Sequence, residues 1–150
     1  MELKTASAMV VAAARFEGTA AQAGEAFLRV AEWLKQRELP AHPWIGVYED
    51  ASDPDTYVEP DTGRMRGEVW IPFHGEARGD GLVEVRRIEP ERVAFTVHEG
   101  DPSTVGATVR ALKEWCRRQG LRPAGRHRQI YLHVAPGAAW RTEVQIPIGP

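Results

Sequence analysis

The sequence Glu-Val-Gln-Ile-Pro-Ile at residues 143–148 closely repeats an earlier stretch, Glu-Val-Trp-Ile-Pro-Phe at residues 68–73. In both stretches a carboxylate opens a short β-branched run that ends at proline, which is typical of a strand. Successive side chains of a strand point to opposite faces, so the glutamate and the residue two positions later share one face. One face of each strand is therefore expected to pack on a core, and the other to carry polar groups.

A longer internal repeat surrounds these two strands. Residues 1–39 align on residues 83–121 without a gap and with nine identities, among them Trp33 with Trp115. Composition alone would give roughly two or three identities over that length. The sequence therefore indicates a duplicated unit.

The length of 150 residues is usual for one compact domain. We predict a single domain, residues 1–150, made of two copies at about 1–74 and 82–148. The glycine-rich segment 75–81 is expected to join the copies as a linker, because it matches neither a Walker nor a dinucleotide-binding pattern.

Each copy is predicted to contain a strand, a helix and two further strands. Apolar residues recur at helical spacing after the first strand, as with Phe27 and Leu34 in the first copy and Leu112 and Cys116 in the second. The predicted fold class is α+β: two pseudo-symmetric β-α-β-β modules that form a mainly antiparallel sheet. The two main helices are expected on one face of that sheet and a ligand cleft on the other. The expected strands are residues 10–16, 44–48, 67–73, 93–98, 129–134 and 142–148.

Strand alternation divides the residues between these two faces. It directs Ile45, Val47 and Ile130 toward the helices. The opposite face is expected to have aromatic walls and few acids, which is the composition of a small-molecule pocket. Its candidate ligand-binding residues are Glu143, Glu68, Tyr131, Tyr48, Trp70, Phe16 and His98, with Trp44, Gln129 and His133 in the same phase.

Other interpretations of these residues stay open. A strand glutamate is commonly just solvent-exposed, and aromatic residues at alternating positions often serve cross-strand packing. The recurrence of a tyrosine with a glutamate in both copies favours the pocket. Trp115, a further candidate, lies about a quarter-turn off the apolar stripe of its helix, where it borders the cleft or closes the core.

Charge and composition narrow the class of protein. The net charge of −2 and the isoelectric point of about 6.2 argue against a nucleic-acid-binding protein, which normally has a basic excess. No apolar run approaches the roughly 20 residues that a membrane span needs, and the N-terminus lacks signal-peptide features. The single cysteine fits a reducing compartment, so a cytoplasmic protein without membrane contact is expected. The five histidines lack metal-ligand spacing, and neither a metal nor a cofactor is expected.

Several segments of the chain together resemble a known family. They are residues 83–100, the helix with Leu112 and Trp115, the triplet Ile-Tyr-Leu at 130–132, and the final strand at 142–148. This pattern resembles the gyrase-inhibitor-like (GyrI-like) family, also known as the effector-binding domain of many bacterial transcription regulators. The resemblance covers essentially the whole chain and is clearest in the second copy.

The resemblance implies a ligand pocket at the pseudo-twofold, with a central glutamate and surrounding aromatic residues that accept lipophilic, often cationic, compounds. It assigns the acidic role to Glu143 first and Glu68 second, and the aromatic role to Tyr131 and Tyr48. The chain departs from the family pattern at Asp101-Pro102, near which relatives often have an aromatic residue, so the ligand type is left open. The repeats run from residue 1 to 148 and leave no room for a helix-turn-helix, so a stand-alone binding domain is expected.

Three functions follow from these features. The leading one is multidrug-type binding of a lipophilic small molecule through Glu143 and aromatic faces. The second, implied by resemblance to some stand-alone relatives, is a hydrolase of electrophilic compounds such as cyclopropanoids, with Glu143 as general acid or base and Tyr131 as hydrogen-bond donor. The third is a gyrase-modulating interaction protein that contacts an acidic partner through Arg117 and Arg118. The identity and charge of the ligand, and the oligomeric state, stay open.

Overall fold

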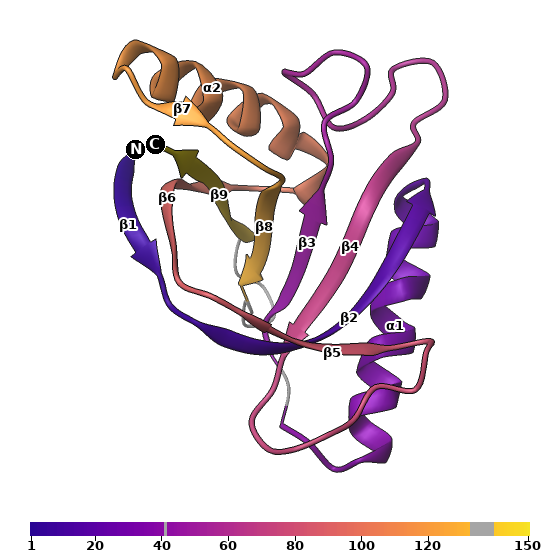
Figure 1. Cartoon of the computed structure of the whole chain (residues 1–150). Coiled ribbons are helices and arrows are strands. Elements are labelled where there is room, and N and C mark those ends of the chain that lie inside the picture. The colour runs from indigo at the N-terminus through magenta and orange to yellow at the C-terminus, as the bar shows by residue number, and fades with distance from the viewer. Residues whose placement is uncertain (41, 133–139) are drawn as a thin grey trace.

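The chain, whose computed structural model describes residues 1–40, 42–132 and 140–150, folds into a curled antiparallel sheet that carries two main helices (Figure 1). The predicted α+β class with a mainly antiparallel sheet is confirmed. The order β2-α1-β3-β4, then β6-α2-β8-β9, follows the expected modules, whereas β1, β5 and β7 were not predicted. The strands are β1 (Glu2–Ala6), β2 (Met9–Gly18), β3 (Trp44–Tyr48), β4 (Met65–Pro72), β5 (Glu84–Ile88), β6 (Glu91–Glu99), β7 (Arg122–Pro123), β8 (His127–Leu132) and β9 (Arg141–Gly149). The helices are α1 (Ala20–Gln36), the short 3₁₀ turn η1 (Pro102–Thr104) and α2 (Val105–Arg118).

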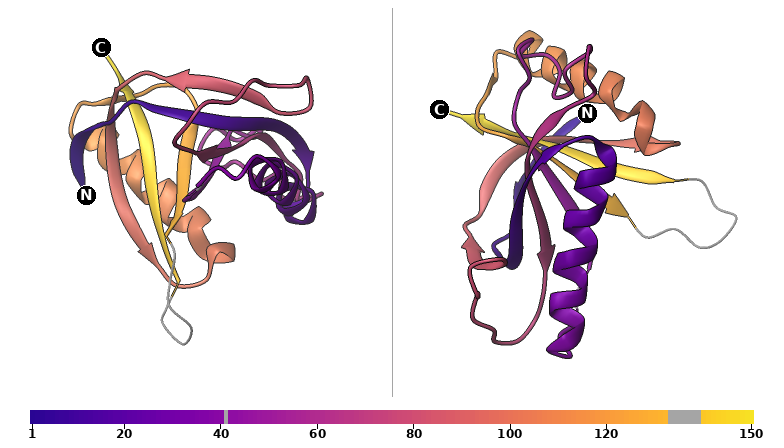
Figure 2. Two further views of the ribbon diagram at one scale, coloured as in Figure 1. Left: turned by 90° about the horizontal axis from the view of Figure 1, so that it is seen from below. Right: turned by 90° about the vertical axis from the view of Figure 1, so that its right-hand side faces the viewer.

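The curl of the sheet comes from the strands at the two ends of its order, β1-β6-β9-β8-β3-β4-β2-β5. Two residues separate β1 from β2, and two separate β5 from β6. β1 pairs with β6 and β2 with β5, and the register is the same on both sides of the break, from Ala6 opposite Glu91 to Met9 opposite Ile88. The two ends of the sheet therefore meet along one long bent strand pair, and the sheet wraps round on itself (Figure 2, left view).

Both helices pack on the same face of this sheet. Gln22 of α1 accepts a hydrogen bond from the backbone N–H of Thr19, which closes the first turn of the helix. The sheet register puts Val69, in the core under α1, and Val144, in the core under α2, in one row across the sheet. The expected placement of both helices on one face is thereby confirmed. Neither helix in the described ranges is long and apolar enough to cross a membrane.

The predicted orientation of the β3 and β8 side chains was wrong. Trp44 of β3 stacks on Phe27 of α1 with ring centroids 4.9 Å apart, so this phase of the strand faces the helix. Tyr131 of β8 also contacts Phe27, edge to face at 6.0 Å. Ile45, in the other phase, lies opposite Trp70 and packs with it on the far face.

The reason for this error is that both faces of the sheet are apolar in its middle. Because the sheet curls, its inner face encloses a second core in which Val11, Ile45 and Val47 are at most 3% exposed. Isoleucine and valine on one side of β3 and aromatic rings on the other are then both buried, so alternation cannot say which side meets the helix. The last two residues of the expected strand 129–134, including His133, lie outside the described residues.

Candidate ligand cleft

A cleft of about 690 Å³ opens on the helix-bearing face, between α1 and η1, the turn that leads into α2. Its volume is in the range of sites for drug-sized ligands. Strands β3 and β8 contribute its floor, and the loop between β3 and β4 contributes one wall. The lining residues are Ala20, Ala23, Gly24, Phe27, Trp44, Tyr48, Tyr57, Val58, Gly63, Met65, Pro102, Ser103, Gln129, Tyr131 and Trp140.

Aromatic side chains dominate this cleft. The parallel stack of Phe27 and Trp44, with ring planes only 4° apart, meets the ring of Tyr131 edge-on. Tyr57 lies 4.9 Å from the ring of Tyr48, on the side of the loop. Trp140 lines the cleft while its side chain stays 57% exposed. The cleft thus offers extended apolar surface to a ligand, with one large ring left open to solvent.

A chain of hydrogen bonds runs along the floor. The hydroxyl groups of Tyr48 and Tyr131 are 2.6 Å apart, and Tyr131 donates to Oε1 of Gln129 at 2.9 Å. Nε2 of Gln129 lies 3.0 Å from Nε2 of His127. The ring of Tyr48 reaches this chain by lying over Gly46, where an added Cβ would approach its hydroxyl oxygen to 2.5 Å. Glycine at position 46 is therefore what lets the two tyrosines meet.

These floor groups are uncharged at neutral pH. Burial raises the pKa of Tyr48 to about 12, against a smaller opposing effect of its hydrogen bond with Tyr131. Burial also raises the pKa of Tyr131 well above its usual value. Burial, and after it the charge of Lys113, lowers the pKa of His127 to about 3. None of the described residues that line the cleft is charged.

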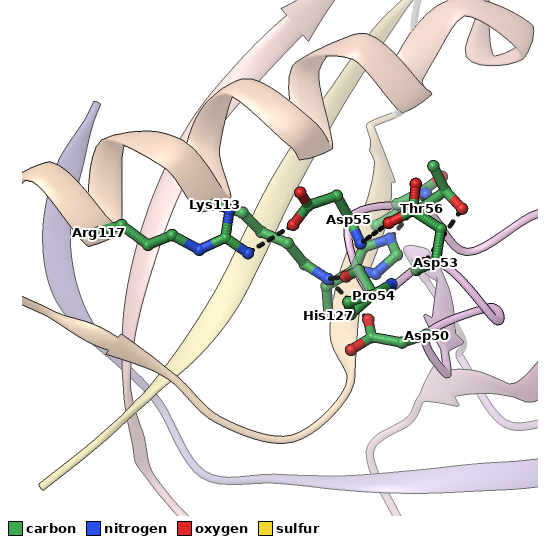
Figure 3. A network of polar contacts seen from close by, with 9 residues as sticks. Asp50, Asp53, Pro54, Asp55, Thr56, Lys113, Arg117 and His127 are labelled. Carbon is green, nitrogen blue, oxygen red and sulfur yellow. Dashed lines mark hydrogen bonds and ion pairs between the residues drawn. The ribbon is translucent and has the colours of Figure 1, made fainter.

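Salt bridges hold the β3–β4 loop, residues 49–64, against α2 (Figure 3). Lys113 of α2 is only 6% exposed and bonds both the carboxylate of Asp50 and the backbone oxygen of Pro54, each at 2.6 Å. One turn further along α2, Arg117 bonds Asp55. The same loop carries Tyr57 and two other lining residues, so α2 fixes the position of one cleft wall although its own side chains stay outside the lining.

The two glutamates predicted for the pocket lie on the opposite, inner face of the sheet. Glu68 is 5% exposed, bonds Arg86, and lies 3.0 Å from Arg126. Burial alone would raise the pKa of Glu68, but the hydrogen bond and charge of Arg86 hold it below its usual value. Glu143 bonds Lys4 at 2.8 Å and Gln145 at 2.6 Å. Both carboxylates therefore have partners within the chain.

The prediction that the tyrosines and the glutamates share one hollow was accordingly wrong. The register places β3 and β8 between the strands of Glu68 and Glu143, a separation of three strand spacings or on the order of 10–15 Å. Tyr48 and Tyr131 line the cleft on the other face. Any part of the glutamates in ligand binding stays a prediction.

The remaining predicted residues are divided between the two faces. Phe16, predicted on the face away from the helices, packs instead in the core under α1, edge to face with Tyr48 at 5.9 Å. His98 bonds Thr108 of α2 at 2.7 Å, and Trp115 packs on the core beneath that helix, which favours the core interpretation of this tryptophan. Trp70 lies on the inner face, where its indole N–H donates to Glu68. Neither His98, Trp115 nor Trp70 is among the described lining residues.

Sequence reasoning missed several lining residues. Alternation puts Trp44 and Gln129 in the strand phase of the two tyrosines, and both line the cleft although neither was among the leading candidates. Helical spacing accounts for Phe27 as part of the apolar stripe of its helix and does not indicate its place in the cleft. Nothing in the sequence marks Tyr57, because its place depends on how the β3–β4 loop folds back against α2.

Comparisons with known proteins agree with this fold and place the chain in a family. Its structure is similar to the crystal structure of the EcmrR C-terminal domain, with a TM-score of 0.81 at 18% identity over 99% of this chain and 96% of that one. It is also similar to a hydrolase from Listeria innocua (TM-score 0.68, 14% identity, 99% and 91% covered) and to SAV2435 bound to tetraphenylphosphonium (0.58, 11%, 99% and 93%). At these identities the likeness shows a common fold. No curated protein sequence matches the chain significantly.

The sequence profile of the family described as the GyrI-like small-molecule-binding domain matches residues 1–149. That is nearly the whole chain, and it confirms the resemblance found in the sequence. The aromatic cleft and the fold shared with the EcmrR C-terminal domain are consistent with this match. The chain therefore belongs to the GyrI-like family of small-molecule-binding domains.

Proposed function

We propose that this chain binds a lipophilic small molecule in the cleft between α1 and η1. The observation that carries the proposal is the cleft itself, about 690 Å³ in volume and lined by six aromatic residues, two of which form its hydrogen-bonded floor. Apolar walls with a few converging polar groups are the usual form of a small-molecule site. SAV2435, which shares the fold, binds the lipophilic ion tetraphenylphosphonium, and this supports a lipophilic ligand here.

Binding is favoured over hydrolysis by the position of the acid. Glu143, the predicted general acid or base, lies on the inner face of the sheet and is paired with Lys4, so it does not face a ligand in the cleft. A tyrosine with a raised pKa is a poor general base at neutral pH, and this applies to Tyr131. The likeness to the Listeria hydrolase is a likeness of fold and does not supply a catalytic residue.

The gyrase-modulating alternative is also less well supported. Arg117, one of its two predicted contacts for an acidic partner, is already bonded to Asp55 of the same chain. A partner would have to displace an interaction that holds the β3–β4 loop.

Titration with the fluorescent probe N-phenyl-1-naphthylamine tests the proposed function. We expect saturable fluorescence enhancement, with affinity at least tenfold weaker in Phe27→Ala or Trp44→Leu, because these rings form the apolar wall. Glu143→Gln serves as a control on the opposite face and should bind the probe as the unchanged protein does. Loss of binding in Glu143→Gln, or unchanged binding in Phe27→Ala and Trp44→Leu, would place the site elsewhere.

A further inference from the structure

We infer that the cleft selects a neutral lipophilic ligand that carries a hydrogen-bond donor, such as an aromatic alcohol or amine. This specificity rests on the proposed function and adds the polarity of the ligand to it. Two observations carry it: the direction of the hydrogen-bond chain on the floor, and the position of every nearby carboxylate outside the described lining.

The direction of the hydrogen-bond chain on the floor follows from counting the hydroxyl hydrogens. A tyrosine hydroxyl has one hydrogen, and that of Tyr131 is donated to Oε1 of Gln129. The 2.6 Å contact between the two tyrosines must then use the hydrogen of Tyr48, with the oxygen of Tyr131 as acceptor. Both hydroxyl hydrogens are committed inside the protein. What the two tyrosines present to a ligand is their oxygen lone pairs.

The orientation of Gln129 keeps this direction fixed. Its amide nitrogen is turned toward Nε2 of His127, and this leaves the amide oxygen facing Tyr131. The imidazole of His127 is 1% exposed and uncharged, and in the tautomer that carries its hydrogen on Nδ1, which has no partner among the described residues, Nε2 accepts from Gln129. To bond with these tyrosines, a ligand that can only accept a hydrogen bond would have to break one bond of this network or reverse all three, whereas a ligand that donates uses lone pairs that are already free.

A cationic ligand is disfavoured in this cleft because the nearby carboxylates lie elsewhere. Glu68 and Glu143 lie across the sheet from the cleft, and each is paired with a cation of the chain. The buried ammonium of Lys113 lies near His127 (Figure 3), and its charge helps to lower the pKa of that imidazole. A cation in the cleft would lose its water without meeting a carboxylate among the described lining residues, and attraction to ring faces offsets only part of that cost.

Calorimetric titration with three compounds on one ring system tests the inference. They are 2-naphthol, which donates a hydrogen bond, 2-methoxynaphthalene, which only accepts, and 2-naphthyltrimethylammonium, which is a cation. At pH 7 we expect 2-naphthol to bind at least tenfold more tightly than either of the others. Equal affinities, or tightest binding of the cation or of the methyl ether, would overturn the inference.

Two single-hydroxyl variants make the test specific for the direction of the chain. In Tyr131→Phe, the hydrogen of Tyr48 loses its acceptor and becomes available to a ligand, so 2-methoxynaphthalene should gain affinity and the preference for 2-naphthol should shrink at least fivefold. In Tyr48→Phe, the oxygen of Tyr131 still accepts, so the preference should persist. The opposite pattern would show that the chain runs the other way.

The two proposals fail in distinguishable ways. If N-phenyl-1-naphthylamine binds in the cleft but the naphthalene compounds show no preference, the selectivity is wrong and the binding function stands. If neither the probe nor any naphthalene compound binds, the proposed function fails and the selectivity fails with it. Thermal unfolding of each variant confirms that removal of one hydroxyl leaves the fold intact.

Discussion

At the scale of single residues, His127 links the cleft floor to the stability of the fold. Burial and the charge of Lys113 lower the pKa of this imidazole from 6.5 to about 3. Below about pH 6.5 the unfolded chain takes up a proton on this ring, whereas the folded chain does not, so acid favours unfolding. The contribution of His127 to stability is therefore complete above pH 6.5 and is lost as the pH falls toward 3.

We predict that the free energy of unfolding falls by roughly 2 kcal/mol through His127 alone between pH 7 and pH 5, at about 1.36 kcal/mol per pH unit below 6.5. Glu68 and Asp80, whose pKa values are lowered, stay ionised in this window. Urea unfolding at pH 7, 6 and 5 measures the slope. In His127→Gln, whose amide oxygen can accept from Gln129, the loss of stability between pH 7 and pH 5 should be smaller by roughly 2 kcal/mol. The other histidines are common to both proteins, so identical slopes would mean that His127 titrates normally.

At the scale of elements, the cleft depends on a helix whose side chains do not line it. Lys113 and Arg117 of α2 hold the β3–β4 loop, and the loop presents Tyr57 to the cleft (Figure 3). Lys113 is nearly enclosed, and without its ammonium both Asp50 and the backbone oxygen of Pro54 lose their partner. An unpaired polar group that is partly buried costs about 1–3 kcal/mol.

Lys113→Met, which keeps the length of the side chain and removes its charge, is therefore predicted to release the loop. We expect faster cleavage of residues 49–64 by endoproteinase Asp-N, and weaker binding of N-phenyl-1-naphthylamine because one wall of the cleft is lost. Lys35→Met on exposed surface near the end of α1 is the matched control and should alter neither property. Unchanged cleavage in Lys113→Met would show that the loop is held by its apolar contacts alone.

At the scale of the whole molecule, sequence reasoning succeeded where one pattern has one cause. Helical spacing identified both helices, because each buries a single stripe, as with Val109 and Leu112 of α2. Strand alternation failed for the orientation of β3, because the curled sheet buries both of its faces and Ile45 is as enclosed as Tyr48. The short strands β1 and β5 mix exposed with half-buried residues and lack a clear apolar pattern, so the sequence does not predict them, yet their pairing produces the curl. Nothing local in a sequence encodes that closure.

The closure also predicts how the molecule unfolds. The core beneath α1 and the core beneath α2 share Tyr57, and the first and second halves pair along β1·β6, β2·β5 and β3·β8. Neither half can lose its packing without exposing part of the other, so we expect one cooperative transition. Leu112→Ala, at a fully buried position in the second half, should lower the stability of the entire chain by about 2–5 kcal/mol. Leu28→Ala, at a 63% exposed position of α1, should change it by less than about 0.5 kcal/mol. Within each variant, tryptophan fluorescence and far-ultraviolet circular dichroism should report the same unfolding midpoint. An additional early transition in Leu112→Ala would show instead that the two halves unfold separately.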